Sequence, residues 1–283
     1  MWLFMLPSVA VMALVLLYPF ASAVYYSFFN YYLGASKISF VGLANYAGLL
    51  QEQRFWGDML TTCIIVGASV ALQLVIGFAL ALALYAATSG VRLISLLNFL
   101  PHVVTPVVAG IFLKWMFVGR WGLLDATLIS LDIFPPDWLG DPVWAKVSLI
   151  LADTWKFMPF LMLVFYAGLQ SFDTSLLEAA EIDGASGWQR LRYVILPMMK
   201  PLIVFVVAIR TMDAFRFFDL VYVLTNGGPG TATETITLYT YQLAFRMLEV
   251  GRASALGVIT LLVVAAMIAG MIVFLQRRGR EAF

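Results

Sequence analysis

Several stretches of this chain are apolar over more residues than a water-soluble helix needs, and this pattern constrains the fold more than any other feature. Residues 58–86 form one such stretch. A predominantly apolar run of about 18 residues or more is long enough to cross a bilayer as a helix. Charged residues make up 12% of the sequence, against about 25% in a typical soluble domain. The sequence therefore predicts an all-α, polytopic membrane protein in contact with the lipid bilayer.

Six membrane-spanning helices are expected within a single transmembrane domain over residues 1–283. Runs of this length also exclude a membrane β-barrel, whose strands are short and alternate in polarity. The six predicted spans cover residues 2–28, 58–86, 92–118, 145–170, 201–225 and 252–276.

The first span could be confused with a cleaved signal peptide, because Ala21-Ser22-Ala23 resembles a signal-peptidase site. A cleaved signal peptide has a positively charged start and a short apolar core. Here no basic residue precedes the apolar run, and the run continues through Phe29. We expect a retained first span, with the possibility left open that a basic tail precedes Met1 in the natural chain.

The longest well-patterned polar stretch is residues 178–201, and it predicts two short helices joined by a tight turn. The spacing S-x-x-E at 175–178 and S-x-x-Q at 186–189 is typical of capping boxes at helix starts. Gly184 lies between them, where a helix can end on a left-handed residue. On periodicity alone, the stretch is interpreted as an amphipathic loop between two membrane helices.

Two prolines follow the second of these short helices. Pro197 and Pro201 are expected to end it and to lead into the next apolar run.

Several ionisable residues lie inside predicted spans, where they are costly unless they pair or face a cavity. In the fifth span they recur every third residue with alternating sign, at Arg210, Asp213, Arg216 and Asp219. The fourth span adds Asp153 and Lys156 at the same spacing. Two interpretations stay open: a ladder of neighbouring ion pairs that only stabilises the bundle, or a polar stripe along a transport path.

The chain lacks the sequence patterns of several other protein classes. It has no G-x-x-x-x-G-K-[ST] phosphate loop, no G-x-S-x-G and no H-E-x-x-H. One histidine and one cysteine make no metal site. A net charge of +1 argues against nucleic acid as a partner. The sequence predicts no enzymatic activity and no cofactor bound by this chain.

Four segments resemble the permease subunits of bacterial ABC importers. Glu178–Pro201 reads EAAEIDGASGWQRLRYVILPMMKP and is similar to the cytoplasmic EAA loop of that family. The other three are Phe40–Tyr46, Leu100–Pro106 and Asp213–Gly230. Together they extend over nearly the whole chain and are most similar to binding-protein-dependent carbohydrate permeases of the maltose, trehalose or glycerol-phosphate type.

This resemblance implies a type I importer permease fold and a set of partners. These are a second, homologous permease, two ATPase subunits that hold ATP and Mg²⁺, and an extracytoplasmic sugar-binding protein. It implies a bacterial or archaeal plasma membrane with both termini cytoplasmic. The distribution of Lys and Arg gives this orientation weak support, chiefly from Arg277, Arg278 and Arg280.

The resemblance also implies roles for individual residues. The EAA loop, about residues 171–200, would couple to the ATPase through Glu178, Ala179, Ala180, Asp183, Gly184 and Ala185. A side chain at Gly184 would disfavour a left-handed turn by roughly 1 kcal/mol or more.

Aromatic residues accompany the charges of the fourth and fifth spans, among them Trp155, Phe157, Phe215, Phe217 and Phe218. Aromatic rings can cover the face of a sugar while charged groups bond its hydroxyls. The predicted substrate path is therefore Asp153, Trp155, Lys156, Arg210, Asp213, Phe215, Arg216 and Asp219. A disaccharide such as trehalose or maltose is the expected substrate, with glycerol phosphate as an alternative. A secondary carrier or channel that uses the charged fifth helix is the competing class.

Overall fold

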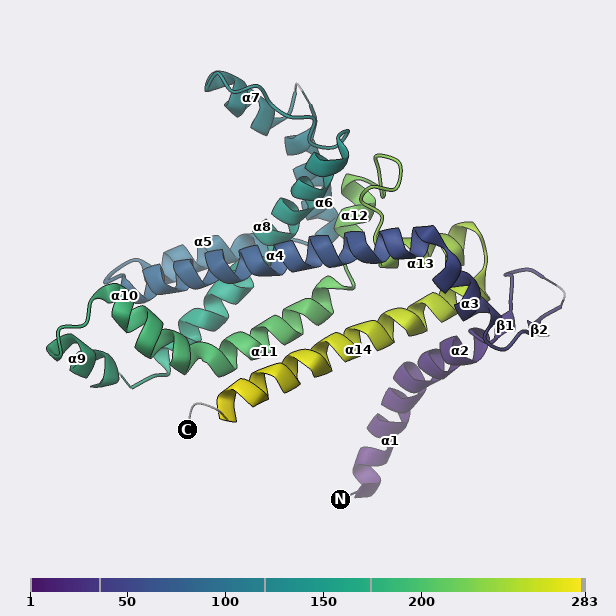
Figure 1. The fold of residues 1–283 in the computed structure, drawn as a ribbon, viewed down its shortest axis with the longest axis horizontal. Coiled ribbons are helices and arrows are strands. Elements are labelled where there is room, and N and C mark those ends of the chain that lie inside the picture. The colour runs from purple at the N-terminus through teal and green to yellow at the C-terminus, as the bar shows by residue number, and fades with distance from the viewer. Residues whose placement is uncertain (1, 36, 120, 174, 281–283) are drawn as a thin grey trace. The chain divides into compact units, whose positions relative to one another are not determined.

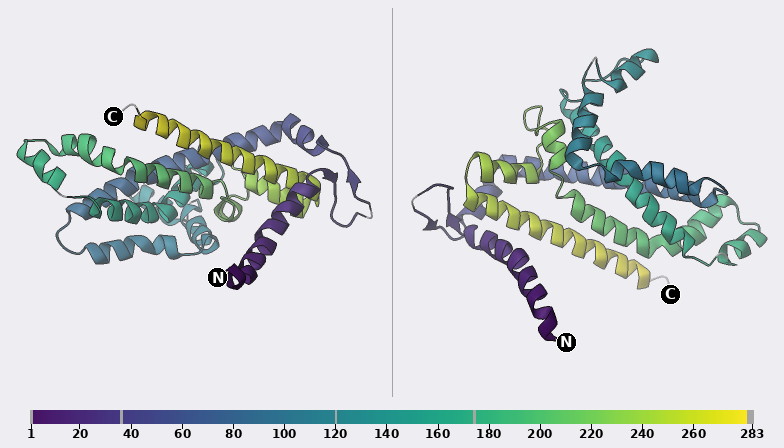
Figure 2. Two further views of the ribbon diagram at one scale, coloured as in Figure 1. Left: turned by 90° about the horizontal axis from the view of Figure 1, so that it is seen from below. Right: turned by 180° about the vertical axis from the view of Figure 1, so that it is seen from behind.

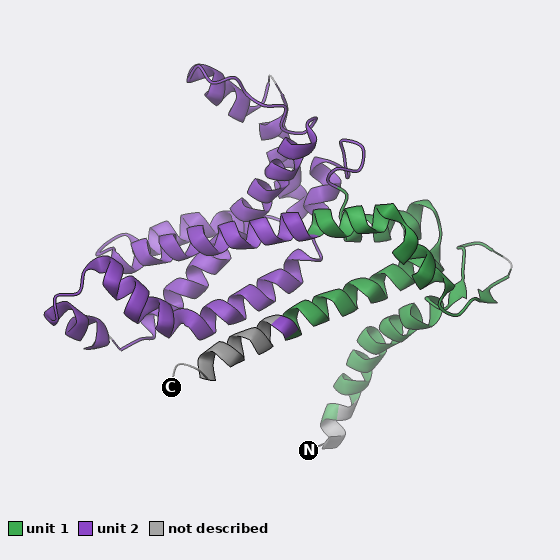
Figure 3. Ribbon diagram, in the orientation of Figure 1, with its two compact units in different colours: residues 1–62, 234–269 green, residues 63–233, 270–283 purple. Residues whose placement is uncertain are grey.

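The computed structural model describes residues 2–35, 37–119, 121–173 and 175–280, and these are mostly helical (Figure 1). The chain divides into two compact units (Figure 3). Unit 1 comprises residues 1–62 and 234–269, and unit 2 comprises residues 63–233 and 270–283.

Among the described residues, five helical segments are long and apolar enough to cross a membrane, and a bent helix pair makes a sixth. The prediction of six spans is confirmed. The helices that form them are α1 (Trp2–Met12) with η1 (Ala13–Leu17) and α2 (Tyr18–Tyr26), α4 (Gln53–Ala86), α5 (Val91–Val103) with α6 (Pro106–Phe117), α8 (Pro142–Gln170), α10 (Gly187–Arg190) with η2 (Leu191–Ile195) and α11 (Leu196–Ala214), and α14 (Val250–Arg280).

The third predicted span is not one straight helix. Helices α5 and α6 meet at an angle of 96°. Pro106 opens α6, and Thr105 before it is extended, with φ −61° and ψ 146°. Proline removes a helical N–H and pushes the preceding residue out of the helical region, which explains the break.

The fifth span differs from its predicted bounds of 201–225 at both ends. It starts earlier, because η2 is a wide π-helical turn that leads directly into α11. Pro197 lies just after this π-helical turn, and Pro201 lies inside α11, so the helix continues through both. The prediction that these prolines end a helix is therefore wrong. The span also ends earlier, at Ala214, and residues 219–224 form the separate helix α12 (Asp219–Leu224).

Unit 1 ties the segment after the first span to that span's end. Strands β1 (Phe29–Asn30) and β2 (Ser39–Phe40) form an antiparallel pair, and α3 (Ala44–Gln51) follows. The buried Asn45 side chain donates to the carbonyl oxygens of Ser27 (2.8 Å) and Phe29 (2.9 Å). Tyr46 donates its hydroxyl to Ser27 Oγ at 2.6 Å. Both residues belong to the Phe40–Tyr46 segment, whose role here is structural.

Unit 1 also contains a network of ion pairs around an apolar cluster. Arg54 donates to both carboxylate oxygens of Glu234, at 3.1 and 2.7 Å. Arg252 pairs with Glu52 and, at 2.7 Å, with Glu249. These pairs join the starts of α4 and α14 to the segment before α13 (Ile236–Tyr241), which continues into η3 (Gln242–Arg246).

Unit 2 has its own core, which holds α4, α8 and α11 together. Its fully buried members include Leu161, Met162 and Phe165 of α8 and Met199 of α11. Phe78 of α4 packs edge-on against Phe165, with ring centroids 5.4 Å apart.

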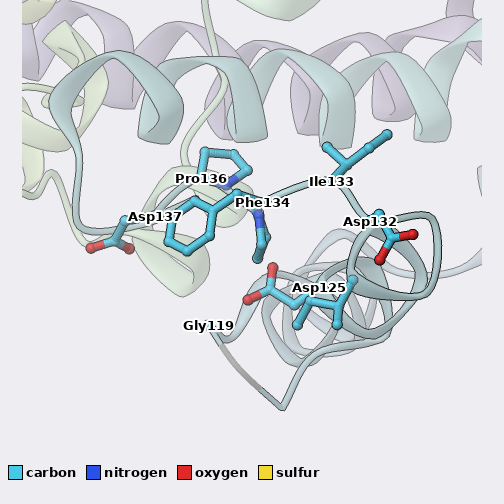
Figure 4. A pocket seen from close by; sticks show the side chains of 9 residues that line it. Gly119, Asp125, Asp132, Ile133, Phe134, Pro136 and Asp137 are labelled. Carbon is cyan, nitrogen blue, oxygen red and sulfur yellow. The ribbon is translucent and has the colours of Figure 1, made fainter.

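The acidic loop between α6 and α8 contains α7 (Leu123–Ser130) and folds on itself. Asp125 Oδ1 accepts a hydrogen bond from Trp138 Nε1 at 2.8 Å. Asp141 caps α8 by accepting from the backbone N–H groups of Val143 and Trp144. Asp125, Asp132 and Asp137 border a hollow of about 760 Å³ with Phe134 on its wall (Figure 4).

Candidate functional site

Two buried charged residues of unit 2 form an ion pair between α8 and α11. Arg210 and Asp153 are only 3% and 2% exposed. Arg210 Nη2 donates to both oxygens of Asp153, at 2.7 and 2.5 Å. A buried charge needs this kind of pairing, because leaving it alone in an apolar interior is costly.

Two further side chains complete the pair. Gln73 of α4 accepts from Arg210 Nε at 2.8 Å and donates to Asp153 Oδ2 at 2.8 Å. The ring of Phe157 lies under the guanidinium, with Arg210 Cζ 4.0 Å from its centroid. Gln73 was not among the site residues predicted from the sequence. Its signal was a bulky amide in the middle of the apolar run 58–86, where only a partnered polar group is stable.

The cluster opens into a small hollow at the end of α11. Arg210 Nη1 also pairs with Asp213 at 3.1 Å, and the Asp213 side chain is half exposed. The hollow has a volume of about 220 Å³. Its lining is Pro106, Asp153, Phe157, Arg210, Asp213, Arg216, Phe217, Phe218, Asp219 and Leu220, and we call it the α8–α11 hollow.

Five of the eight predicted path residues line this hollow, namely Asp153, Arg210, Asp213, Arg216 and Asp219. The other three lie elsewhere. Trp155 stacks on Phe112 at 6.3 Å, and Phe215 is buried. Lys156 donates to the carbonyl oxygens of His102 and Val104.

Of the two interpretations left open by the sequence, the ladder of ion pairs along one helix is contradicted. Helix α11 ends at Ala214, so Arg216 lies in a turn and Asp219 starts α12. Only the Arg210–Asp213 step of the ladder is a salt bridge among the described residues. Regular spacing suggested a straight helix, whereas the chain turns there and brings the charges around a hollow.

The second candidate feature is the hairpin of α9 (Ser175–Ile182) and α10, which we call the 175–190 hairpin. It lies at one extremity of unit 2 (green in Figures 1 and 2). Gly184 has φ +78°, the left-handed conformation that the sequence predicted. Ala185 N–H donates to Ala180 O (2.9 Å) and Gly184 N–H to Glu181 O (3.0 Å). This pair of bonds is the Schellman motif, which ends α9 and satisfies its carbonyls.

The start of α10 is also as predicted. The Ser186 hydroxyl accepts from Gln189 N–H, and the Gln189 side chain accepts from Ser186 N–H at 2.7 Å, completing a capping box. Arg190 bridges back to Glu181 at 2.9 Å. The hairpin is therefore internally closed.

The start of α9 differs from the prediction. Ser175 lies inside the helix rather than before it, and its N–H donates to Asp173 Oδ1 at 3.0 Å. This hydrogen bond holds the pKa of the exposed Asp173 carboxyl below its usual range. Thr174, between them, lies outside the described residues.

The hairpin exposes large apolar side chains. Ile182 is 86% exposed, Trp188 is 68% exposed, and Leu176 is exposed as well. Tyr193 in the following turn η2 is also exposed. The predicted coupling residues are exposed at Glu178, Ala179, Asp183 and Gly184 and half-buried at Ala180 and Ala185. An exposed apolar surface on a segment with satisfied backbone bonds is typical of a protein interaction site.

The fold and these two features define a multi-pass helical membrane protein of the importer-permease class. The chain belongs to the family of binding-protein-dependent transport system inner membrane components, whose model matches residues 41–280. The resemblance found in the sequence is thereby confirmed, and the family consists of transport components rather than enzymes.

Individual relatives cover nearly the whole chain. It is 33% identical to the trehalose/maltose transport system permease protein MalF of Thermococcus litoralis, over 93% of this chain and 89% of that protein. It is 35% identical to the trehalose transport system permease protein SugA of Mycobacterium tuberculosis, over 89% and 81%. It is 33% identical to the sulfoquinovosyl glycerol transport system permease protein SmoG of Agrobacterium fabrum, over 91% and 84%.

The fold matches a solved structure over almost its full length. A bacterial ABC transporter that imports the acidic polysaccharide alginate aligns with a TM-score of 0.84 at 22% identity, covering 98% of this chain and 96% of that one. This agreement confirms the type I importer permease fold.

Proposed function

We propose that this chain is one of two membrane subunits of an ATP-driven sugar importer and forms half of its translocation path. One observation carries the proposal. The 175–190 hairpin and the α8–α11 hollow lie at the two ends of one continuous helical segment, Gly187–Ala214. At about 1.5 Å per residue, this segment is roughly 40 Å long. A displacement of the hairpin is passed along it to Arg210 and Asp213.

The motor in this proposal is a separate ATPase that binds the 175–190 hairpin. The sequence has no phosphate loop of its own, and the hairpin's exposed Ile182 and Trp188 fit an apolar groove on a partner. ATP and Mg²⁺ would be bound by that partner. The hairpin is then cytoplasmic, and with six spans both termini are cytoplasmic as well.

The remaining partners follow from the family and from the size of the hollow. At about 220 Å³, the hollow is smaller than the roughly 300–1,000 Å³ of ordinary ligand pockets. A second, homologous permease would supply the other wall. An extracytoplasmic binding protein would deliver the sugar, as the alginate transporter's structure with a substrate-bound periplasmic protein illustrates for that system.

The charges of the hollow favour an uncharged sugar over glycerol phosphate. The guanidinium of Arg210 already donates to Asp153, Gln73 and Asp213. Three carboxylates and two guanidiniums line the hollow, which gives a formal charge of −1. An anionic substrate would be repelled, whereas hydroxyls can bond the exposed Asp213 carboxylate. Relatives named for trehalose and maltose agree with this choice.

The proposal is tested with the assembled complex in proteoliposomes. We expect uptake of trehalose or maltose when ATP is present on the hairpin side, and no uptake from an ion gradient alone. A P-loop ATPase should co-purify with the chain. Ion-driven uptake without any ATPase would instead identify a secondary carrier. Preferred uptake of glycerol phosphate or of a sulfonated sugar would overturn the choice of an uncharged substrate.

A further inference from the structure

Two lysines inside membrane-spanning helices use their ammonium groups in an unusual way. Lys156 of α8 is buried, and its Nζ donates to Val104 O (2.5 Å) and His102 O (3.3 Å) at the end of α5. Lys114 of α6 donates to Val223 O (3.0 Å) at the end of α12. Among the described residues, neither forms a salt bridge with a carboxylate.

Each lysine replaces a helical hydrogen bond that the chain has lost. The carbonyl of His102 would normally accept from the N–H of residue 106, but residue 106 is proline and has none. The carbonyl of Val223 would accept from Gly227 N–H, but this group donates to Thr225 Oγ1 at 3.3 Å. The break at Pro106 lies within the bent span, where no water is available and a freed carbonyl needs another donor. A cation at this position also interacts favourably with the negative, C-terminal end of the helix dipole.

These two contacts lie beside helices that line the α8–α11 hollow: Val104 comes two residues before the start of α6, and Val223 belongs to α12. Pro106 at the start of α6 and Asp219 and Leu220 at the start of α12 are lining residues. Helices α6 and α12 pack against each other (Figure 1). Gly110 makes this close approach possible, because a Cβ there would lie 3.0 Å from Val223 Cγ1.

The Lys156 contact is reciprocal. His102 Nδ1 lies 3.3 Å from the carbonyl oxygen of Lys156, and the imidazole stacks on Phe160 with ring centroids 5.4 Å apart. The end of α5 is therefore fixed to α8 from both sides, at the residue that precedes the 96° bend by only a few positions.

We propose that Lys156 and Lys114 are positioning residues of the transport path, because each ammonium substitutes for a missing helix hydrogen bond. Lys156 fixes the α5–α6 break, at which the lining helix α6 begins, and Lys114 fixes the end of the lining helix α12. The inference rests on the proposed function in one respect, because it assumes that the α8–α11 hollow is part of the translocation path. It gives Lys156 a different role from the substrate contact that the sequence suggested, because its ammonium is already bonded to the chain.

The test combines a structural and a transport measurement on the whole complex. In a Cys63→Ser background, spin labels at Leu97→Cys on α5 and Ile111→Cys on α6, both exposed positions, report the bend between the helices. Lys156→Met removes the donors at similar length, and Lys156→Arg keeps them. Lys146→Met, on the same helix α8, is the matched control. Lys114→Met is a second variant at an exposed site.

We expect Lys156→Met to broaden the label distance distribution and to lower maximal uptake about tenfold, the scale set by leaving a buried acceptor unpaired. Lys156→Arg should restore the distance and most of the uptake, and Lys146→Met should change neither. An unchanged distance in Lys156→Met would overturn the proposal, and so would a loss of uptake that depends on which sugar is offered. If the Lys156→Met complex does not assemble, Lys114→Met tests the proposal instead. Uptake should be lost in Lys114→Met and retained in Lys114→Arg. The label distance needs no sugar, so it stands even if the complex transports nothing.

Discussion

The 175–190 hairpin exposes apolar side chains, whereas the charged cluster of the α8–α11 hollow buries charged ones. The hairpin exposes Ile182 and Trp188, whereas the cluster buries Arg210 and Asp153 almost completely. Apolar side chains are ordinarily buried and charged ones exposed. The hairpin's exposed apolar surface supports the proposal that a partner binds it, whereas the cluster is satisfied within the chain.

This difference indicates which feature forms an interface and which forms a fixed framework. The cluster is held by Gln73 and Phe157 as well as by its own ion pair, so removing one member should destabilise the chain itself. The hairpin's internal bonds are closed by the Gly184 turn and the Ser186 cap. Changing its exposed side chains should leave the chain folded and weaken only association.

The largest effect is expected from breaking the buried pair. Asp153→Ala leaves the buried guanidinium of Arg210 with only the half-exposed Asp213 as a charged partner and should reduce the stability of the complex by about 3–5 kcal/mol. Thermal unfolding of the purified complex in detergent measures this. Asp213→Ala is the matched control, because its half-exposed carboxylate makes only one contact to Arg210. Similar losses in both variants would show that the cluster is not a fixed framework.

A smaller effect, of another kind, is expected at the hairpin. Ile182→Asp should leave the chain's unfolding temperature unchanged and weaken ATPase binding by about 2 kcal/mol or more, the scale of an interface hot spot. Co-purification of the ATPase at increasing salt and detergent gives the readout. Phe134→Asp removes an equally exposed ring from the loop after α7 and should have no effect. An ATPase retained equally by both variants would argue against the hairpin as the docking site.

The sequence predicted the hairpin in detail because its structure is local. A left-handed Gly184 and the Ser186–Gln189 box depend on residues only a few positions apart. For the charged cluster, the sequence predicted most of the residues but not how the chain arranges them. Its spacing of three fits a straight helix, whereas α11 ends at Ala214 and the following helix α12 packs against α6, a contact between distant segments that the spacing does not encode.

The contacts of Gln73 also could not be predicted from local sequence. It is separated from Asp153 by 80 positions along the chain, and the two meet because α4 packs beside α8. The amide was visible in the sequence, but its partner could not be named before the helices were placed. The ammonium of Lys156 likewise had an obvious carboxylate candidate in Asp153, yet it bonds to backbone carbonyls across the α5–α6 break.

The account depends on one helical segment joining the hairpin to the hollow, and a flexible joint within this segment tests it most directly. Val204→Gly with Phe205→Gly should soften the middle of α11 by about 1 kcal/mol per glycine, whereas alanine at both positions makes a similar truncation and keeps the helix stiff. Stimulation of the co-purified ATPase by sugar-loaded binding protein is the measurement. We predict that the glycine variant keeps its ATPase but loses stimulation, and that the alanine variant retains both. Equal stimulation in the two variants would contradict the claim that α11 carries the movement.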